Sequence, residues 1–253
     1  MKKIDYQNQY RPLLLADFNH GRVVEGTVDP KRVAQVVEGL NMRARGLPVV
    51  FRAKGIEKLE GGSCSSLSLR VVEQILPYLN EPNLMERTKE VVKAPDTEAQ
   101  KRNNECDRLR EGYRIQQAAF NAFSLTDRNG DHSVEKISAF VRYYGLEVEE
   151  STLQLTVDSS LSLKGPLGLM GPGLYLLRIV KGADNDRGEV HGHSAIVVKM
   201  GTSILYFDVN YGLYGGEAGK IAHLMGELLR ANKERFDLDY FQFHRLAYST
   251  ATT

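Results

Sequence analysis

The sequence predicts an α+β fold, in which helices fill the first part of the chain and an antiparallel sheet fills the last part. Before residue 150, apolar side chains recur every three to four positions in several segments, a spacing typical of amphipathic helices. After residue 150, short runs of β-branched and aromatic residues are bounded by Gly, Asp and Asn, which indicates strands. With 253 residues, the chain is long enough to bury a sizeable core.

The best-marked helix begins near Cys64, directly after the breaker Gly61-Gly62, and Pro77 kinks or ends it. Its apolar stripe consists of Leu67, Val71, Val72, Ile75 and Leu76. Further helices are predicted over residues 29–42, within 96–136, over 133–144 with a stop at Gly145, and over 217–231.

Strands are predicted in the last third of the chain, over residues 174–180, 193–200, 203–209 and 240–248. The Gly- and Pro-rich segment 165–173 predicts a rigid, kinked connection into the first of these strands. Residues 1–50 mix short apolar runs with charge, so we expect an N-terminal extension or lobe there and one main domain over 51–253.

Charge and cysteine content exclude several classes of protein. Lys and Arg number 33 against 32 Asp and Glu, so a net charge of +1 gives no long-range attraction to nucleic acid or anionic lipid. Cys64 and Cys106 are too few for a disulfide scaffold and lack the C-x-x-C spacing of a zinc site. No apolar stretch approaches the roughly 18 to 20 residues of a membrane span, and no signal-peptide core follows Met1. We expect a soluble protein with free thiols and no metal or organic cofactor.

One segment has part of the pattern of a calcium-binding loop. Residues 127–138 place Asp or Asn at loop positions one, three and five. His132 stands where that loop requires Gly, and Ser138 where it requires Glu. We therefore expect no calcium site here, but an Asx-rich turn that caps the helix from Ser133.

Cys64 is the candidate nucleophile, because two glycines lead the chain to a helix start at that thiol. The unpaired N–H groups and the positive end of the helix dipole favour a thiolate at such a position. The alternative is a small buried residue at a turn, which is common for a free cysteine. A base and an acid elsewhere in the sequence decide between the two interpretations.

His193 and Asp208 are the candidate base and acid. They lie in two strand-like runs separated by Gly201-Thr202. If these two residues form a two-residue hairpin loop, Ala195 faces Asp208 across the hairpin. Since side chains alternate with period two, His193 and Asp208 are then diagonal neighbours on one face, at roughly 7 Å between backbones. A three-residue loop would place them on opposite faces.

These three residues have the chemistry of a catalytic triad. A thiol needs a base within hydrogen-bond reach to hold it as thiolate and later to protonate the leaving group. The base in turn needs an acceptor that fixes its tautomer. Cys64, His193 and Asp208 would supply these groups in that order, and His191 is a reserve candidate for the base. Alone, His193 would read as a histidine bonded to backbone in a half-buried strand.

Three short motifs resemble the cysteine proteases of bacterial effectors typified by Yersinia outer protein T, distant relatives of papain. The motifs are Gly62-Ser63-Cys64-Ser65-Ser66-Leu67-Ser68, the His-initiated strand 193–198, and Phe207-Asp208-Val209-Asn210-Tyr211-Gly212. The third is the most specific, because it matches the F-D-x-N-x-G of that family. The resemblance covers the region from about Gly55 to Gly212. It implies a papain-like fold for the domain over 51–253, with Cys64 as nucleophile, His193 as general base and acid, and Asp208 as its orienter. It also implies a host protein as substrate and secretion into the host cell without a cleaved signal peptide.

Departures from that pattern leave alternatives open. Papain-like enzymes usually take an oxyanion-hole donor from a Gln shortly before the nucleophile, but residues 54–60 contain no Gln or Asn. The backbone N–H of Cys64 would be one donor, and the second is unidentified. The same triad also suits a glutamine deamidase or transglutaminase of a host signalling protein. A papain-like binding module without activity is the alternative from another class.

Overall fold

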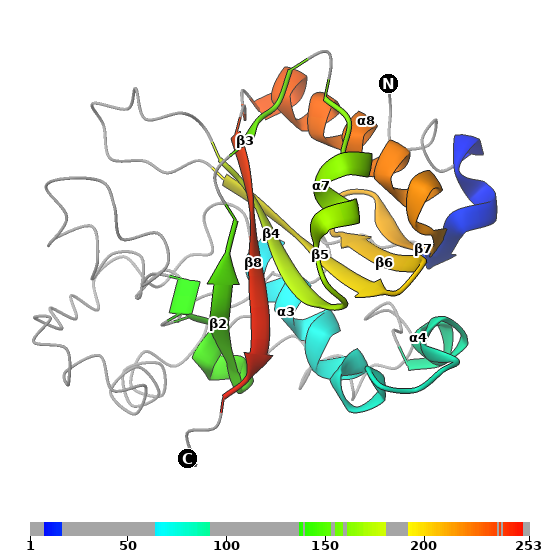
Figure 1. Ribbon diagram of the computed structural model, residues 1–253, viewed down its shortest axis with the longest axis vertical. Coiled ribbons are helices and arrows are strands. Elements are labelled where there is room, and N and C mark those ends of the chain that lie inside the picture. Colours follow the sequence, from blue (N-terminus) through cyan, green and yellow to red (C-terminus); the bar gives the residue numbers. More distant parts are fainter. Residues whose placement is uncertain are drawn as a thin grey trace, which may run out of the picture.

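A computed structural model describes residues 8–16, 64–91, 137–138, 140–152, 155–158, 161–180, 192–236, 238 and 240–249. The helices predicted over 29–42 and within 96–136 lie outside these residues, as does the loop with calcium-like spacing up to residue 136. Figure 1 shows a twisted sheet with helices on both of its faces. This arrangement confirms the prediction of helices combined with an antiparallel sheet.

All the described strands belong to one antiparallel sheet, in the order β1-β7-β6-β5-β4-β8-β2, with β3 paired to β8. Their bounds are β1 Leu14–Ala16, β2 Leu146–Ser151, β3 Leu155–Thr156, β4 Gly173–Val180, β5 Gly192–Met200, β6 Ser203–Asp208, β7 Gly212–Glu217 and β8 Tyr240–Tyr248. Strands β4, β5, β6 and β8 match the four predicted strands. The other strands were not predicted from the sequence.

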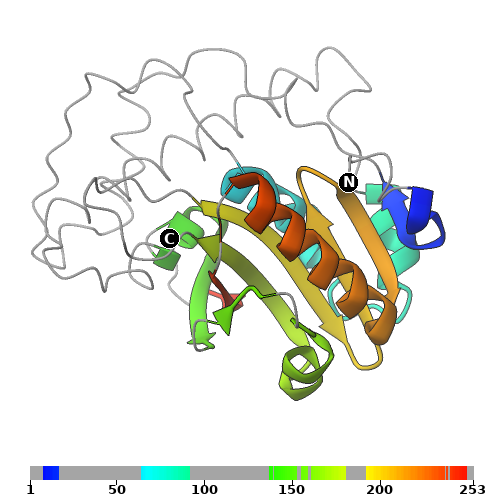
Figure 2. The same ribbon diagram turned by 90° about the horizontal axis from the view of Figure 1, so that it is seen from above.

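The described helices lie on both faces of the sheet. They include α3 Cys64–Ile75, α4 Leu84–Val91, α7 Lys164–Leu169 and α8 Ala218–Phe236, with 3-10 turns at Arg11–Leu13, Leu76–Tyr78 and Arg142–Tyr144. Residues 137–138 and 140–141, within the helix predicted over 133–144, are also helical. Figure 2 shows α8 lying along one face while α3 runs behind the sheet. Strand β6 serves both faces, since Leu205 and Phe207 lie in the core cluster of α3 while Ile204 and Tyr206 lie in that of α8.

Helix α3 begins and ends where the sequence predicts. It starts at Cys64 and gives way after Ile75 to a 3-10 turn that contains Pro77. Val72 and Ile75 of its apolar stripe are buried against the sheet. Gly145 also ends a helical segment as predicted, at a left-handed φ of 71° that glycine adopts without strain.

The hairpin of β5 and β6 has the predicted register. Met200 pairs with Ser203 and Ala195 pairs with Asp208, so Gly201-Thr202 is a two-residue loop. Gly201 has a φ of 57°, and a positive φ at the first loop residue is what tight hairpin turns require. This register fixes the relation between the start of β5 and the end of β6.

The N-terminal segment is joined to the far edge of the sheet. Strand β1 pairs antiparallel with β7. The Tyr10 hydroxyl lies 2.7 Å from Nδ1 of His223 and donates a 2.7 Å hydrogen bond to Glu227, both on α8. Residues 8–16 of the predicted extension therefore pack on the main sheet and its covering helix, whereas the boundary near residue 50 remains a prediction.

Segment 165–173, predicted as a rigid, kinked connection, includes most of the short helix α7. Helix α7 accommodates Pro166 in its first turn, where a missing N–H costs nothing. Lys199 of β5 caps the other end, because its Nζ donates to the carbonyl oxygens of Leu167 and Met170. The chain then enters β4 at Gly173.

Candidate active site

Cys64 is the first residue of α3, and its side chain is buried, with 8% of the residue exposed. Its Sγ lies 3.9 Å from the carbonyl oxygen of Gly192, the first residue of β5, as a weak thiol hydrogen bond. The N-terminal N–H groups of a helix have no partner within it, so the thiol sits at a place that favours negative charge. Helix α3 thus delivers Cys64 to the start of β5.

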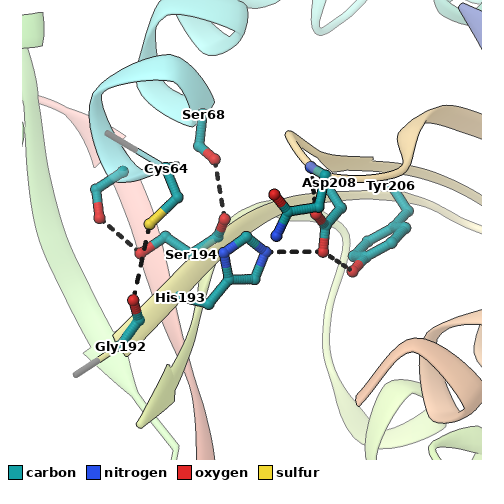
Figure 3. A network of polar contacts seen from close by, with 9 residues as sticks. Cys64, Ser68, Gly192, His193, Ser194, Tyr206 and Asp208 are labelled. Atoms are coloured by element: carbon teal, nitrogen blue, oxygen red, sulfur yellow. Dashed lines mark hydrogen bonds and ion pairs between the residues drawn. The ribbon is translucent and has the colours of Figure 1, made fainter. Parts of the chain in front are cut away.

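His193 and Asp208 form a direct pair on the hairpin. Nε2 of His193 lies 2.9 Å from Oδ2 of Asp208, and both side chains are buried. The contact follows from the register, because Asp208 faces Ala195 and side chains two apart share a face. Figure 3 shows the second ring nitrogen of His193 on the side of the ring where the Cys64 sulfur lies, opposite Asp208. The structure thus brings Cys64, His193 and Asp208 together.

Two further groups hold the Asp208 carboxylate. The Tyr206 hydroxyl donates to Oδ2 at 3.0 Å, and the backbone N–H of Asn210 donates to Oδ1 at 2.8 Å. Burial, and then the charge of Asp208, raise the pKa of Tyr206 well above its ordinary value, so its hydroxyl remains a donor. Tyr206 was not among the predicted site residues, although period two places it on the same face as Asp208.

The pKa shifts of His193 and Cys64 favour a thiolate and imidazolium pair. Burial alone lowers the pKa of His193, but the charge and hydrogen bond of Asp208, with a smaller effect of Cys64, raise it to about 10. Burial alone raises the pKa of Cys64. The hydrogen bond and charge of His193, then Arg178 and the backbone of Ser194, outweigh burial and lower it from 9.0. Both shifts favour a negative charge on the Cys64 sulfur and a positive charge on the His193 ring.

Arg178 is a buried cation beside this pair. It lies on β4 opposite Ser194, and a Cβ added at Gly192 would lie 3.3 Å from its Nη2. Its positive charge lowers the pKa of the Cys64 thiol. Arg178 was not among the predicted site residues, although a single charge inside the apolar run of 174–180 is unusual.

A group of serines joins α3 to β5 next to the pair. Ser65 and Ser194, the residues after Cys64 and His193, have hydroxyl oxygens 2.7 Å apart, and Ser68 donates to the Ser194 carbonyl at 3.2 Å. All three side chains are buried. These contacts were not predicted, because no local sequence pattern shows which strand a helix packs on.

Some predicted features of the site lie outside the described residues. They include the reserve base His191, the glycines before Cys64 and the stretch 54–60, so the second oxyanion-hole donor remains unidentified. Within the described residues, no three His, Cys, Asp or Glu side chains gather in a way that could hold a metal ion. No helix in the same part of the chain has the length and apolar character to cross a membrane.

Comparison with known proteins gives a likeness of fold. No protein-family model matches the sequence. No curated protein matches it either. Among solved structures, the chain is similar to the crystal structure of the Pseudomonas avirulence protein AvrPphB, with a TM-score of 0.51 and 15% sequence identity. The similarity covers 74% of this chain and 93% of that one. The chain therefore shares its fold with a Pseudomonas avirulence protein.

Proposed function

We propose that this chain is a papain-like thiol hydrolase that cleaves amide bonds of a protein substrate, with Cys64, His193 and Asp208 as its catalytic triad. The observation that carries the proposal is the 2.9 Å contact between His193 Nε2 and Asp208 Oδ2, next to a thiol at a helix start. A buried His and Asp pair alone has many structural uses. Here the Cys64 thiol also shares a hydrogen bond with the His193 imidazole, so the pair can act as the base and the orienting acid of a nucleophile.

The chemistry follows from the positions of these groups. The Cys64 thiolate attacks the carbonyl carbon of the amide, and the backbone N–H of Cys64 stabilises the oxyanion. His193 keeps Nε2 on Asp208, so its other ring nitrogen, Nδ1, gives its proton to the departing nitrogen. Water then attacks the thioester, His193 accepts a proton from that water, and the thiolate is released.

Two similarities support assignment to bacterial effectors. The three sequence motifs resemble the Yersinia outer protein T family, and the fold is similar to that of a protein described as an avirulence protein. On this basis, we propose a host protein as substrate and secretion into the host cell. The net charge of +1 indicates that shape and local contacts, rather than bulk attraction, select that substrate.

The first test measures the reactivity of the thiol. Iodoacetamide alkylation of Cys64 and Cys106 is followed across pH by peptide mass spectrometry. Cys64 should react faster than a model thiol near neutral pH, and His193→Ala should remove that advantage. If Cys64 reacts no faster than a model thiol, the proposed nucleophile is wrong. If His193→Ala has no effect on a fast Cys64, the base is misassigned and His191 is tested next.

The second test identifies the reaction. A peptide library from a eukaryotic cytosol is incubated with the protein and an added primary amine, and Cys64→Ala is the control. Fragments that depend on Cys64 support a protease. A mass increase of about one dalton without fragments would indicate a deamidase, and amine adducts on Gln would indicate a transglutaminase. If no product forms although Cys64 is activated, the result would favour the binding-module alternative for these peptides.

A further inference from the structure

The residues that follow the proposed nucleophile and base in the sequence touch each other. Ser65 follows Cys64 in α3, Ser194 follows His193 in β5, and their hydroxyl oxygens lie 2.7 Å apart. We infer that this serine pair is a positioning device that fixes the distance between the Cys64 thiolate and the His193 imidazole. The inference rests on the proposed function, since it assigns a role around the same thiol.

Ser194 contacts residues within the first five positions of α3 through each of its polar groups. Its hydroxyl bonds to Ser65, and its carbonyl oxygen accepts from Ser68 at 3.2 Å. Its backbone N–H donates to Cys64, which lowers the pKa of the thiol. One residue of β5 therefore contacts three of the first five residues of α3, as Figure 3 shows for its labelled members.

The serine contact lies on the opposite face of β5 from the His193 side chain. Along β5, Ser194 points to the face that α3 covers, while His193 and Ala195 point to the other face. Cys64 and His193 thus approach from different sides at the start of the strand. A contact between the residues next to them holds the helix and the strand in register without occupying the reacting atoms.

An apolar contact would hold the two elements less exactly. Ser65 is 1% exposed and Ser194 is fully buried, on the face of the sheet whose apolar core contains Val72 and Ile196. Apolar packing is non-directional, whereas a hydroxyl pair has a defined distance and angle. If one hydroxyl is removed, the other loses its partner in a buried place. These properties favour a geometric role over a contribution to stability alone.

The chain offers a matched control for the loss of a buried hydroxyl. Thr88 on α4 is fully buried and donates to the Leu84 carbonyl within its own helix at 2.6 Å. Thr88→Val removes that hydroxyl and keeps the shape of the side chain. Any effect shared by Thr88→Val and the serine variants reflects stability rather than the position of Cys64.

The experiment uses a Cys106→Ser background, so that Cys64 is the remaining thiol of the chain. Ser65→Ala, Ser194→Ala, the double variant, Ser65→Thr and Thr88→Val are compared with that background. Each variant is scored by the pH profile of iodoacetamide alkylation and by urea unfolding. Removing either hydroxyl should slow alkylation at neutral pH by roughly three- to tenfold, the factor that corresponds to the net free energy of one hydrogen bond. The profile should also move to higher pH, because the contact that lowers the pKa of Cys64 is loosened.

Three further results complete the expected pattern. The double variant should be no slower than the slower single variant, since both changes break one contact. Ser65→Thr keeps a hydroxyl and should retain most of the alkylation rate of the background. Thr88→Val should leave the alkylation profile unchanged. If Ser194→Ala does not fold, Ser65→Ala tests the same contact from the helix.

Two outcomes would overturn the inference. Ser65→Ala with an unchanged alkylation profile would show that the pair does not position the thiol. An equal slowing by Thr88→Val would assign the effect to general stability. Both outcomes leave the proposed function standing as long as the background Cys64 is activated and His193→Ala removes that activation. A background Cys64 that behaves as a model thiol would instead reject the proposed function.

Discussion

The Tyr206 hydroxyl and the His193 imidazole share one oxygen of Asp208, with Tyr206 Oη 3.0 Å from Oδ2. Because this hydroxyl stays protonated, it donates to the carboxylate throughout the pH range in which His193 is charged. The carboxylate is also fixed at Oδ1 by the backbone of Asn210. Asp208 therefore cannot turn away from His193 without breaking a bond to its own strand or turn.

Tyr206→Phe should destabilise the fold by about 1.5 to 3 kcal/mol, the range for hydrogen bonds to charged groups. Urea unfolding measures this change, and the ring volume is kept. Tyr214→Phe is the matched control, because Tyr214 is equally buried but its hydroxyl donates to the neutral Tyr211 carbonyl at 3.0 Å. That control should lose about 0.5 to 1.5 kcal/mol. A smaller loss at Tyr206 than at Tyr214 would contradict a charged acceptor at Asp208.

His193 and His244 should titrate on opposite sides of neutrality. Asp208 raises the pKa of His193 to about 10, against the effect of burial, whereas burial and then Arg178 lower that of His244 to about 4. Ring chemical shifts in NMR should therefore show His193 charged and His244 neutral at pH 7. Two rings that both titrate near 6.5 would contradict the electrostatics of this site.

These shifts also give signs for the pH dependence of stability. The stability from charged His193 is fully present below its unfolded pKa of 6.5 and is lost as pH rises through about 10. His244 binds its proton at a higher pH in the unfolded chain than in the folded one. Stability therefore falls as the pH drops from 6.5 toward 4. We expect urea unfolding at pH 5, 7 and 9 to show how each variant alters the pH dependence of stability. Compared with the unmodified chain, His193→Gln should lose less stability between pH 7 and 9, and His244→Phe should lose less between pH 7 and 5.

Arg178→Gln should raise the pKa of the Cys64 thiol and slow its alkylation at neutral pH, because it removes a buried positive charge that favours the thiolate. Arg178→Lys keeps a charge and should retain part of the effect. Arg70→Gln is the control, since Arg70 lies on α3 but pairs with Glu73 at 2.7 Å. An alkylation profile that responds equally to the loss of Arg70 would refute a specific role of Arg178.

Gly215→Ala should destabilise the contact between the N-terminal segment and β7. An added Cβ would lie 2.7 Å from Leu15 Cδ1 and 3.0 Å from Leu205 Cδ2, so we expect a loss of about 1 to 3 kcal/mol from overpacking. Leu15→Ala in the same chain should recover part of this loss, as measured by thermal unfolding. Gly168→Ala on α7 is the control, because its Cβ would meet no atom within 4 Å, and it should be neutral or stabilising. Equal losses at both glycines would argue against the close approach of Leu15.

The predictable parts of the fold are those with a local cause. The two-residue loop and period two were sufficient to place His193 beside Asp208, because both residues belong to one hairpin. Glycines before a helical stripe were sufficient to place Cys64 at a helix start. Strand β7 was missed because three of its six residues are glycine, which has low strand propensity. Its Gly215 and Gly216 are small because the N-terminal segment packs on them, a contact between distant segments.

The unpredicted parts of the site depend on packing between distant segments. The contact of Ser65 with Ser194 exists only because α3 lies on β5, and nothing near either residue encodes that choice. Arg178 could be noticed as a charge in an apolar strand, but its effect on Cys64 requires knowledge of both positions. Burial of Tyr206 and Asp208 on one face likewise follows from α8, which covers that side of β6.

The two halves of the site close over a long span of chain, since Ser65 and Ser194 are separated by 129 positions. The entropy cost of closing a loop grows slowly with its length, so doubling such a span costs only about 0.6 kcal/mol. The connections between the elements of this span can therefore lengthen at little cost, whereas strand β4 within it must remain, because it pairs with β5. The geometry of the site thus depends on which elements dock against each other rather than on how many residues connect them.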